Sequence, residues 1–215
     1  MAKVCFLDND IIHKLVAFQL FDEAIATLEI DRNSLQVLPT AKFFFQRKQK
    51  KHLLGSLSDA PDPVLNVVIE LVSSCASIIA DLDDTAAEEL IQFQQVEGIH
   101  EGEAALIVAT RSQTDFLLLS GDKNCMRGLA AIPEPIYRRL CGRVICLEQI
   151  ILKLIEVKGF VFVRDRVLPM ASFDKSLQIC FGLVNPATEE NVIAGLNSYI
   201  NDIQQQAPNL LAVFR

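Results

Sequence analysis

Three acidic residues stand at positions where carboxylates commonly hold a divalent metal ion. Asp8 directly follows an apolar run at residues 3–7, Asp122 closely follows another at residues 116–119, and Glu103 opens a helical segment just before the second run. Hard cations prefer oxygen ligands, and no histidine or cysteine pattern accompanies these acids, so Mg²⁺ or Mn²⁺ is favoured over zinc. Such an ion activates water and polarises a phosphoryl oxygen, which suits phosphodiester hydrolysis.

Each acid also has a simpler interpretation. Asp8 can cap the helix that follows it, Glu103 can complement a helix dipole, and Asp122 can belong to turn chemistry after a glycine. Secondary metal-ligand candidates lie close by in the sequence, at Asp10, Glu101 and Asn124. Glu101 points about 200° away from Glu103 on a helix, so at most one of the two faces the site well.

Short apolar runs predict the strands that would position these acids. Continuous runs bounded by polar residues are typical of strands covered on both faces of a parallel sheet. Such runs lie at residues 3–7, 35–38, 116–119, 144–147 and 160–163. If the first and third are neighbours, Asp8 and Asp122 project from the same edge, because ligands of open α/β sheets bind outside the carboxyl ends of the strands.

Helical segments alternate with these runs, which predicts a three-layer α/β/α fold around a mainly parallel sheet. The predicted helices lie at residues 11–18, 22–29, 40–54, 64–80, 84–96, 103–111 and 188–206, with a loop at 55–63. Residues 1–150 are expected to form one domain. Residues 151–215 are expected to form a C-terminal helical extension packed on it, less regular over 164–186.

Composition narrows the class of protein. Of 215 residues, 51% are apolar, enough for a sizeable core, yet no apolar run is long enough to span a membrane. Lys3 interrupts the N-terminal apolar stretch too early for a signal peptide, so a cytoplasmic location is expected. The six cysteines show no metal-binding spacing and suit a buried, apolar role. A net charge of −7 argues against binding long stretches of nucleic acid, but not against contact with a few nucleotides.

Three segments together resemble the PIN-domain nucleases. They are Phe6-Leu-Asp-Asn-Asp-Ile-Ile12, Glu101-Gly-Glu-Ala-Ala-Leu-Ile-Val-Ala109 and Asp115-Phe-Leu-Leu-Leu-Ser-Gly-Asp-Lys123. Their order and approximate spacing are similar to those of the family, over roughly residues 3–130. The resemblance implies a PIN-like fold and a metal-dependent nuclease, with RNA or single-stranded nucleic acid as substrate. It places Asp8, Glu103 and Asp122 among the metal-binding acids, and Asp10 where the family often has Asn.

The same resemblance bears on partners, and the sequence departs from the family pattern at one point. Many family members are toxins of bacterial toxin–antitoxin pairs, so an antitoxin-like protein partner and a homodimer are left open. Many members also carry a glutamate in the helix after the second strand, but the segment at residues 39–47 holds no acid. A catalytically inactive PIN-like binding or regulatory module therefore remains an alternative.

A second enzyme class shares the start of the pattern. Asp8-Asn-Asp10 also resembles the opening of haloacid-dehalogenase-like phosphatases, in which the first aspartate would be the nucleophile and the second a general acid/base. That family has a later Gly-Asp-x-x-x-Asp, whereas Met126 stands at the last position here.

The strongest basic cluster lies within the predicted helix at residues 40–54, at Lys42, Arg47, Lys48, Lys50, Lys51 and His52. It is expected either to bind phosphates beside the acidic site or simply to form a solvated helix face.

Overall fold

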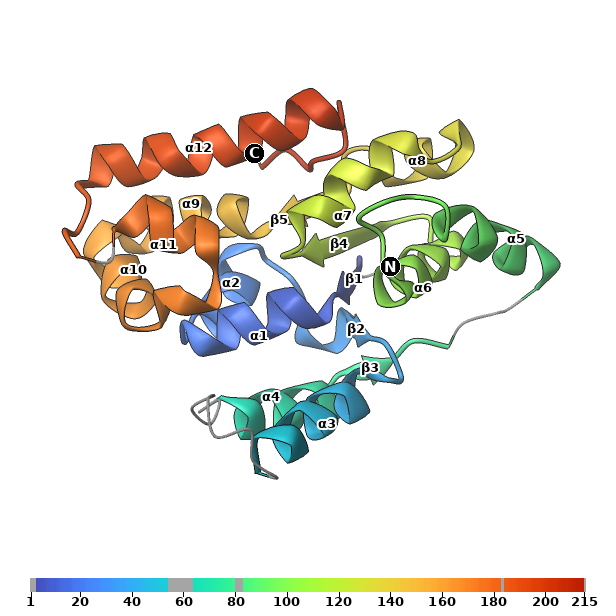
Figure 1. The fold of residues 1–215 in the computed structure, drawn as a ribbon, viewed down its shortest axis with the longest axis horizontal. Helices are drawn as coiled ribbons and strands as arrows, with labels where there is room; N and C mark the ends of the chain where they lie inside the picture. The colour runs from blue at the N-terminus through green and yellow to red at the C-terminus, as the bar shows by residue number, and fades with distance from the viewer. Residues whose placement is uncertain (1–2, 54–63, 80–82, 183, 215) are drawn as a thin grey trace.

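A single parallel sheet forms the centre of the molecule. The computed structural model describes residues 3–53, 64–79, 83–182 and 184–214. Within them, the strands are β1 (Val4–Leu7), β2 (Leu35–Val37), β3 (Ala76–Ser77), β4 (Phe116–Ser120) and β5 (Val144–Cys146). All pair in parallel, in the order β3-β2-β1-β4-β5 (Figure 1). The chain runs outward from β1 to β3 and then returns to β4, so strand order reverses between β1 and β4. Ligands of such sheets bind at this point.

Successive strand residues enter two different hydrophobic cores. Cys5 and Leu7 point into one core and Phe6 into the other, as the two-residue repeat of a strand requires. The first core receives α1 (Asn9–Ala17), α2 (Phe21–Thr27), α3 (Ala41–Leu53), α4 (Leu65–Ser74), α9 (Leu147–Lys158), α10 (Phe160–Val167) and α11 (Lys175–Phe181). The second receives α5 (Asp84–Phe93), α6 (Glu101–Ala109), α7 (Lys123–Gly128) and α8 (Glu134–Leu140). The arrangement is α/β and compatible with three α/β/α layers.

The last helix, α12 (Glu189–Gln206), joins the two cores. Val192 and Leu196 pack into the first, whereas Ile200 and Ile203 pack into the second. The chain then returns to the sheet, where the amide of Ala212 donates to the carbonyl of Val144 on β5 at 2.7 Å. Across the described ranges, no helix is both long enough and apolar enough to cross a membrane.

The predicted parallel α/β sheet is confirmed, as are most of the elements around the acids. Helix α12 begins after Thr188, whose hydroxyl caps it. Asp83, one residue before the expected position, caps α5, which ends at Phe93 instead of near residue 96. The predicted loop at residues 55–63 lies outside the described residues.

One helix and one strand were predicted wrongly. The predicted helix at residues 64–80 ends at Ser74, because the chain then becomes extended and pairs as β3 with β2. The apolar run at residues 160–163 is not a strand but the first turn of α10, in which Val163 and Val167 face the core at helical spacing. The stretch 164–186, expected to be less regular, holds the rest of α10, a 3₁₀ segment (Leu168–Phe173) and α11.

Candidate functional site

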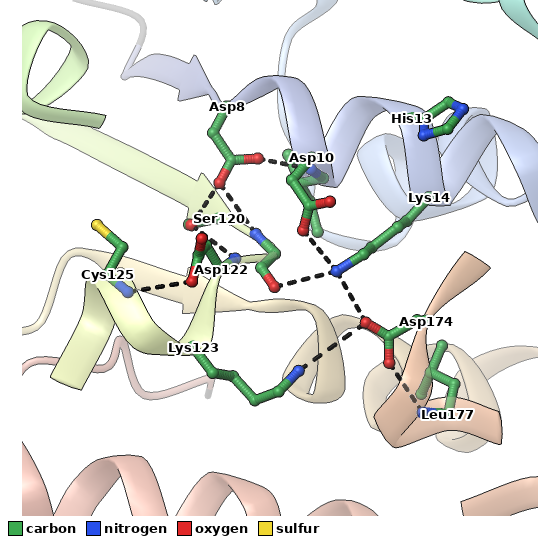
Figure 2. A network of polar contacts seen from close by, with 12 residues as sticks. Asp8, Asp10, His13, Lys14, Ser120, Asp122, Lys123, Cys125, Asp174 and Leu177 are labelled. Atoms are coloured by element: carbon green, nitrogen blue, oxygen red, sulfur yellow. Dashed lines mark hydrogen bonds and ion pairs between the residues drawn. The ribbon is translucent and has the colours of Figure 1, made fainter. Parts of the chain in front are cut away.

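The pairing of β1 with β4 brings two loops together at the carboxyl edge of the sheet. Leu7 lies opposite Leu119, and the amide of Asp8 donates to the Leu119 carbonyl at 3.2 Å. Asp8 therefore faces the segment from Ser120 to Asp122, as expected for neighbouring strands (Figure 2).

Both carboxylate oxygens of Asp8 accept hydrogen bonds. Oδ1 accepts from the amide of Ile11 at 2.5 Å, which caps α1. Oδ2 accepts from the Ser120 hydroxyl and from the amide of Gly121, at 3.1 Å in the second case. The side chain is only 7% exposed. Burial, and then repulsion from the carboxylate of Asp10, raises the pKa of Asp8 to about 7, although these hydrogen bonds oppose the rise.

Asp122 and Glu103 also begin helices. Asp122 Oδ1 accepts from the amides of Asn124 and Cys125, at 2.8 and 3.1 Å, at the start of α7. Glu103 Oε2 accepts from the amide of His100 at 2.9 Å, which forms part of a capping box at the start of α6. Asp8 and Glu103 thus stabilise helix N-termini as their simpler interpretations predict, whereas Asp122, expected to belong to a turn, also caps a helix.

These three helix starts also converge on one place. Asp8 and Glu103 line a common pocket together with Ser120, Cys125 and apolar side chains, and its free interior is only about 10 Å³, roughly the space of one water molecule. The amide of Asp122 donates to the Ser120 hydroxyl at 3.2 Å, which links Asp122 to Asp8 through one side chain. Burial raises the pKa of the Cys125 thiol well above its usual value, and the negative charges of Glu103, Asp122 and Asp8 add to this effect. All three carboxylates are therefore close enough to act on one sulfur atom.

A buried lysine lies beside this group (Figure 2). Lys14 Nζ lies 2.5 Å from Asp10 Oδ2 and 2.8 Å from Asp174 Oδ2, and it donates to the carbonyl of Gly121 at 3.2 Å. Burial would lower the pKa of Lys14, but the two carboxylates outweigh it and raise that pKa. Gly121 has to be a glycine here, because a Cβ at this position would lie 2.5 Å from Asp10 Oδ2.

The ionic network continues away from the acids. Lys123 Nζ lies 2.8 Å from Glu148 Oε1 and 3.9 Å from Asp174 Oδ2. Burial would raise the pKa of Asp174, but Lys14 and Lys123 hold it below its usual value. Glu148 is fully buried, and its second oxygen, Oε2, has no hydrogen-bond partner. Lys123 is thus engaged in the interior instead of extending toward a bound phosphate.

The other sequence candidates contribute less to the pocket. Asp10 is held by Lys14, and Glu101 is exposed beside Glu103. The side-chain oxygen of Asn124 accepts from Arg127 at 3.1 Å. Within the described parts of the chain, no three His, Cys, Asp or Glu side chains lie close enough together to hold a metal ion. The structure therefore places Asp8 and Glu103 on the lining of one pocket and links Asp122 to Asp8 through Ser120, but it does not bring the three acids to common ligand distances.

Sequence reasoning missed Lys14, Ser120, Glu148 and Asp174. Lys14 could have been suspected, because it follows Asp10 by four residues, the spacing of helical ion pairs. Asp174 carries the signal of an N-cap, since it precedes α11 and accepts from the amide of Leu177 at 2.8 Å. Its contact with Lys14 joins residues 160 positions apart, and no local pattern indicates it.

Comparison of the chain with family models, with curated proteins and with solved structures gives no significant match.

Proposed function

We propose that the pocket at the carboxyl edge of β1 and β4 binds Mg²⁺ or Mn²⁺ and hydrolyses phosphodiesters of RNA or another single-stranded nucleic acid. The fold would then be PIN-like, as the three sequence segments suggest. The parallel sheet of order β3-β2-β1-β4-β5 is compatible with this proposal, because it brings Asp8 and Asp122 to one edge.

The observation that carries the proposal is the electrostatic state of Asp8. This carboxylate is buried beside Asp10, and its pKa is raised to about 7. Among the described residues, no lysine or arginine forms an ion pair with it. A buried carboxylate in this state gains from a nearby cation, and strongly perturbed acids in a pocket are typical of functional sites.

The chemistry of the oxygen donors fits a hard cation. The capping bonds use Oε2 of Glu103 and Oδ1 of Asp122, which leaves the second oxygen of each side chain for a ligand role. Like charges repel in the absence of a cation, which accounts for the separation of these three carboxylates beyond common ligand distances. Asp8, Glu103 and Asp122 are the side chains that would hold the ion.

The bound ion would supply an activated water and polarise the phosphoryl group. The chain itself fixes the acids that hold it. The hydroxyl of Ser120 and the amide of Gly121 orient Asp8, and the first turns of α6 and α7 orient Glu103 and Asp122. Lys14 neutralises Asp10, so the site carries fewer uncompensated charges than its sequence suggests.

The substitution Asp122→Asn tests this proposal. Asparagine caps helices about as well as aspartate, so the fold should persist, whereas a neutral amide should abolish cleavage of single-stranded RNA in Mn²⁺. Asp31→Asn is the matched control, because Asp31 caps the 3₁₀ turn Arg32–Ser34 in an exposed position remote from the pocket. Cleavage at the wild-type rate by purified Asp122→Asn would refute the mechanism.

The phosphatase alternative is less favoured by this geometry. Attack on phosphorus requires an oxygen of Asp8 that a phosphoryl group can reach, but the side chain is buried, and Met126 stands in place of that family's last aspartate.

A non-catalytic module is the second candidate, and a specific observation favours it. All three acids already serve as helix caps, and the described residues hold no ready group of three metal-binding side chains. If Mn²⁺ leaves the unfolding midpoint of the wild type unchanged at pH 8, the pocket is structural and this alternative replaces the nuclease.

A further inference from the structure

Helix α3 exposes two aromatic rings. The Phe43 and Phe44 side chains are 69% and 52% exposed. Every other phenylalanine or tyrosine in the described parts of the chain is buried or partly buried. Single exposed apolar side chains are common, but two adjacent exposed rings on one helix form an apolar patch of the kind that marks a contact surface.

Basic side chains share the exposed face of α3. Arg47 and Lys50 follow Phe43 by four and seven residues, which places all three on one side of the helix. Lys42 is exposed next to Phe43. The opposite side of the helix is buried, where Phe45 lies 6.0 Å from the ring of His13 on α1.

The charge of α3 contrasts with that of the whole chain. Residues 41–53 contain lysines and an arginine but no aspartate or glutamate, whereas the protein has a net charge of −7. A partner for this face must therefore be anionic and must also offer flat apolar surfaces to the two rings. Unpaired nucleic acid combines both, because its bases stack on aromatic side chains while its phosphates pair with Arg and Lys.

The position of α3 connects this face with the candidate site. Leu38 lies between β2 and the start of α3, and its Cδ1 would lie 4.0 Å from a Cβ built on Gly102. Gly102 immediately precedes Glu103, so α3 starts beside the first turn of α6, which holds one of the three acids. From Phe43 to Lys50 the helix rises about 10 Å, which corresponds to roughly three nucleotides of a stacked strand.

We infer that the exposed face of α3, formed by Phe43, Phe44, Arg47, Lys50 and Lys42, binds the unpaired bases and phosphates of a single strand beside the acidic pocket. This inference rests on the proposed function for its substrate class, but binding to α3 can be measured without hydrolysis. The side chains of residues 51 and 52, part of the same basic cluster in the sequence, lie outside the described residues.

The test is fluorescence anisotropy with a labelled uridine oligonucleotide of about 12 nucleotides, in EDTA so that no metal-dependent cleavage occurs. Phe43→Ala should weaken binding about 5- to 100-fold, the loss expected for one stacked base. Arg47→Ala should lower the slope of log affinity against log salt by about 0.7, as for the loss of one phosphate contact.

Two substitutions serve as matched controls. Ile179→Ala removes an equally exposed apolar side chain from α11, and Arg138→Ala removes an exposed arginine from α8. Both should leave affinity within about twofold, because surface changes away from a binding face rarely cost more.

Several results would overturn the inference. The first is unchanged oligonucleotide affinity in Phe43→Ala. The second is equal competition by double-stranded RNA, which offers no unpaired bases. The third is binding to anionic phospholipid vesicles that is stronger than oligonucleotide binding and equally sensitive to Phe43→Ala. Cleavage in Mn²⁺ with unchanged binding in Phe43→Ala would refute the α3 surface but keep the nuclease. Binding that depends on Phe43, with no cleavage in Mn²⁺, would keep the α3 surface but refute the nuclease.

Discussion

Two buried carboxylates, Asp8 and Asp174, belong to one polar network through Gly121 and Lys14, and they differ in what neutralises them. Asp174 lies between the ammonium groups of Lys14 and Lys123, which hold its pKa below the usual value (Figure 2). Asp8 is nearly as buried, but it receives only neutral N–H and O–H donors, and its pKa is raised to about 7.

Under the proposed function, this contrast distinguishes a structural carboxylate, Asp174, from one that would hold a ligand, Asp8. A buried carboxylate paired with lysine is already satisfied, and its removal leaves a lysine uncompensated. A buried carboxylate without a cation destabilises the folded protein once it ionises, and this cost is tolerated where a ligand removes it. The comparison thus predicts opposite behaviour of Asp8 and Asp174 toward pH, substitution and metal.

The largest expected effect is the dependence of stability on pH that Asp8 causes. An unfolded aspartate has a pKa of about 3.9, so between about pH 4 and pH 7 the unfolded chain has lost a proton that native Asp8 retains. Stability therefore falls as pH rises through this window, by about 1.4 kcal/mol per unit, with an upper bound of about 4 kcal/mol.

Urea unfolding of the wild type and of Asp8→Asn, followed from pH 4.5 to 8, measures the pH dependence of the free energy of unfolding that Asp8 causes. The wild type should lose stability relative to the variant as pH rises, and saturating Mn²⁺ should remove the difference in slope, because the ion binds the ionised carboxylate. Parallel curves for the two proteins would mean that Asp8 does not titrate in this range and would remove the contrast with Asp174.

The next largest effect is expected from Asp174→Asn. An amide still accepts from the amide of Leu177, so the cap of α11 survives, but Lys14 and Lys123 both lose a buried counter-ion. Breaking a buried ion pair costs about 3–5 kcal/mol. We expect about 3 kcal/mol, since Lys14 keeps Asp10 and Lys123 keeps Glu148.

The measurement is the free energy of unfolding in urea at pH 7, with Asp165→Asn as the control. Asp165 pairs with Arg164 at the surface, where such pairs contribute about 0–1 kcal/mol. If both substitutions cost the same small amount, the ion pairs of Asp174 with Lys14 and Lys123 do not stabilise the fold.

The difference between Asp8 and Asp174 also shows which features of the site could be predicted from the sequence. The neighbouring strands β1 and β4, and the acids that follow them, were predictable because apolar runs and polar breaks are local signals. Asp8 as a helix cap was predictable for the same reason. Nothing local distinguishes Asp8 from Asp174, because what separates them is the presence of lysines brought together by the folded chain.

The errors in the elements have a similar physical origin. Residues 160–163, Phe-Val-Phe-Val, favour a strand by composition, but a short apolar run fits a buried helix turn equally well. Gly159 decides between them, because its φ of 90° ends α9 and starts α10 at once. The strand β3 has two exposed residues and no apolar pattern, so only its pairing with β2 defines it.

The smallest expected effect on stability comes from Glu103→Gln, and it sharpens the comparison most. Glutamine can replace glutamate in a capping box, so the amide of His100 keeps its acceptor and the free energy of unfolding should change by less than about 0.5 kcal/mol. The negative charge beside Cys125 is nevertheless lost. If Glu103 serves only to cap α6, the variant should respond to Mn²⁺ as the wild type does. If it shares an ion with Asp8, the Mn²⁺-induced rise in the unfolding midpoint at pH 8 should shrink.

Glu189→Gln, in the exposed first turn of α12, is the matched control for a helix-start glutamate remote from the pocket. An equal Mn²⁺ response in wild type, Glu103→Gln and Glu189→Gln would mean that Glu103 is a purely structural residue, as Asp174 is, and does not share an ion with Asp8.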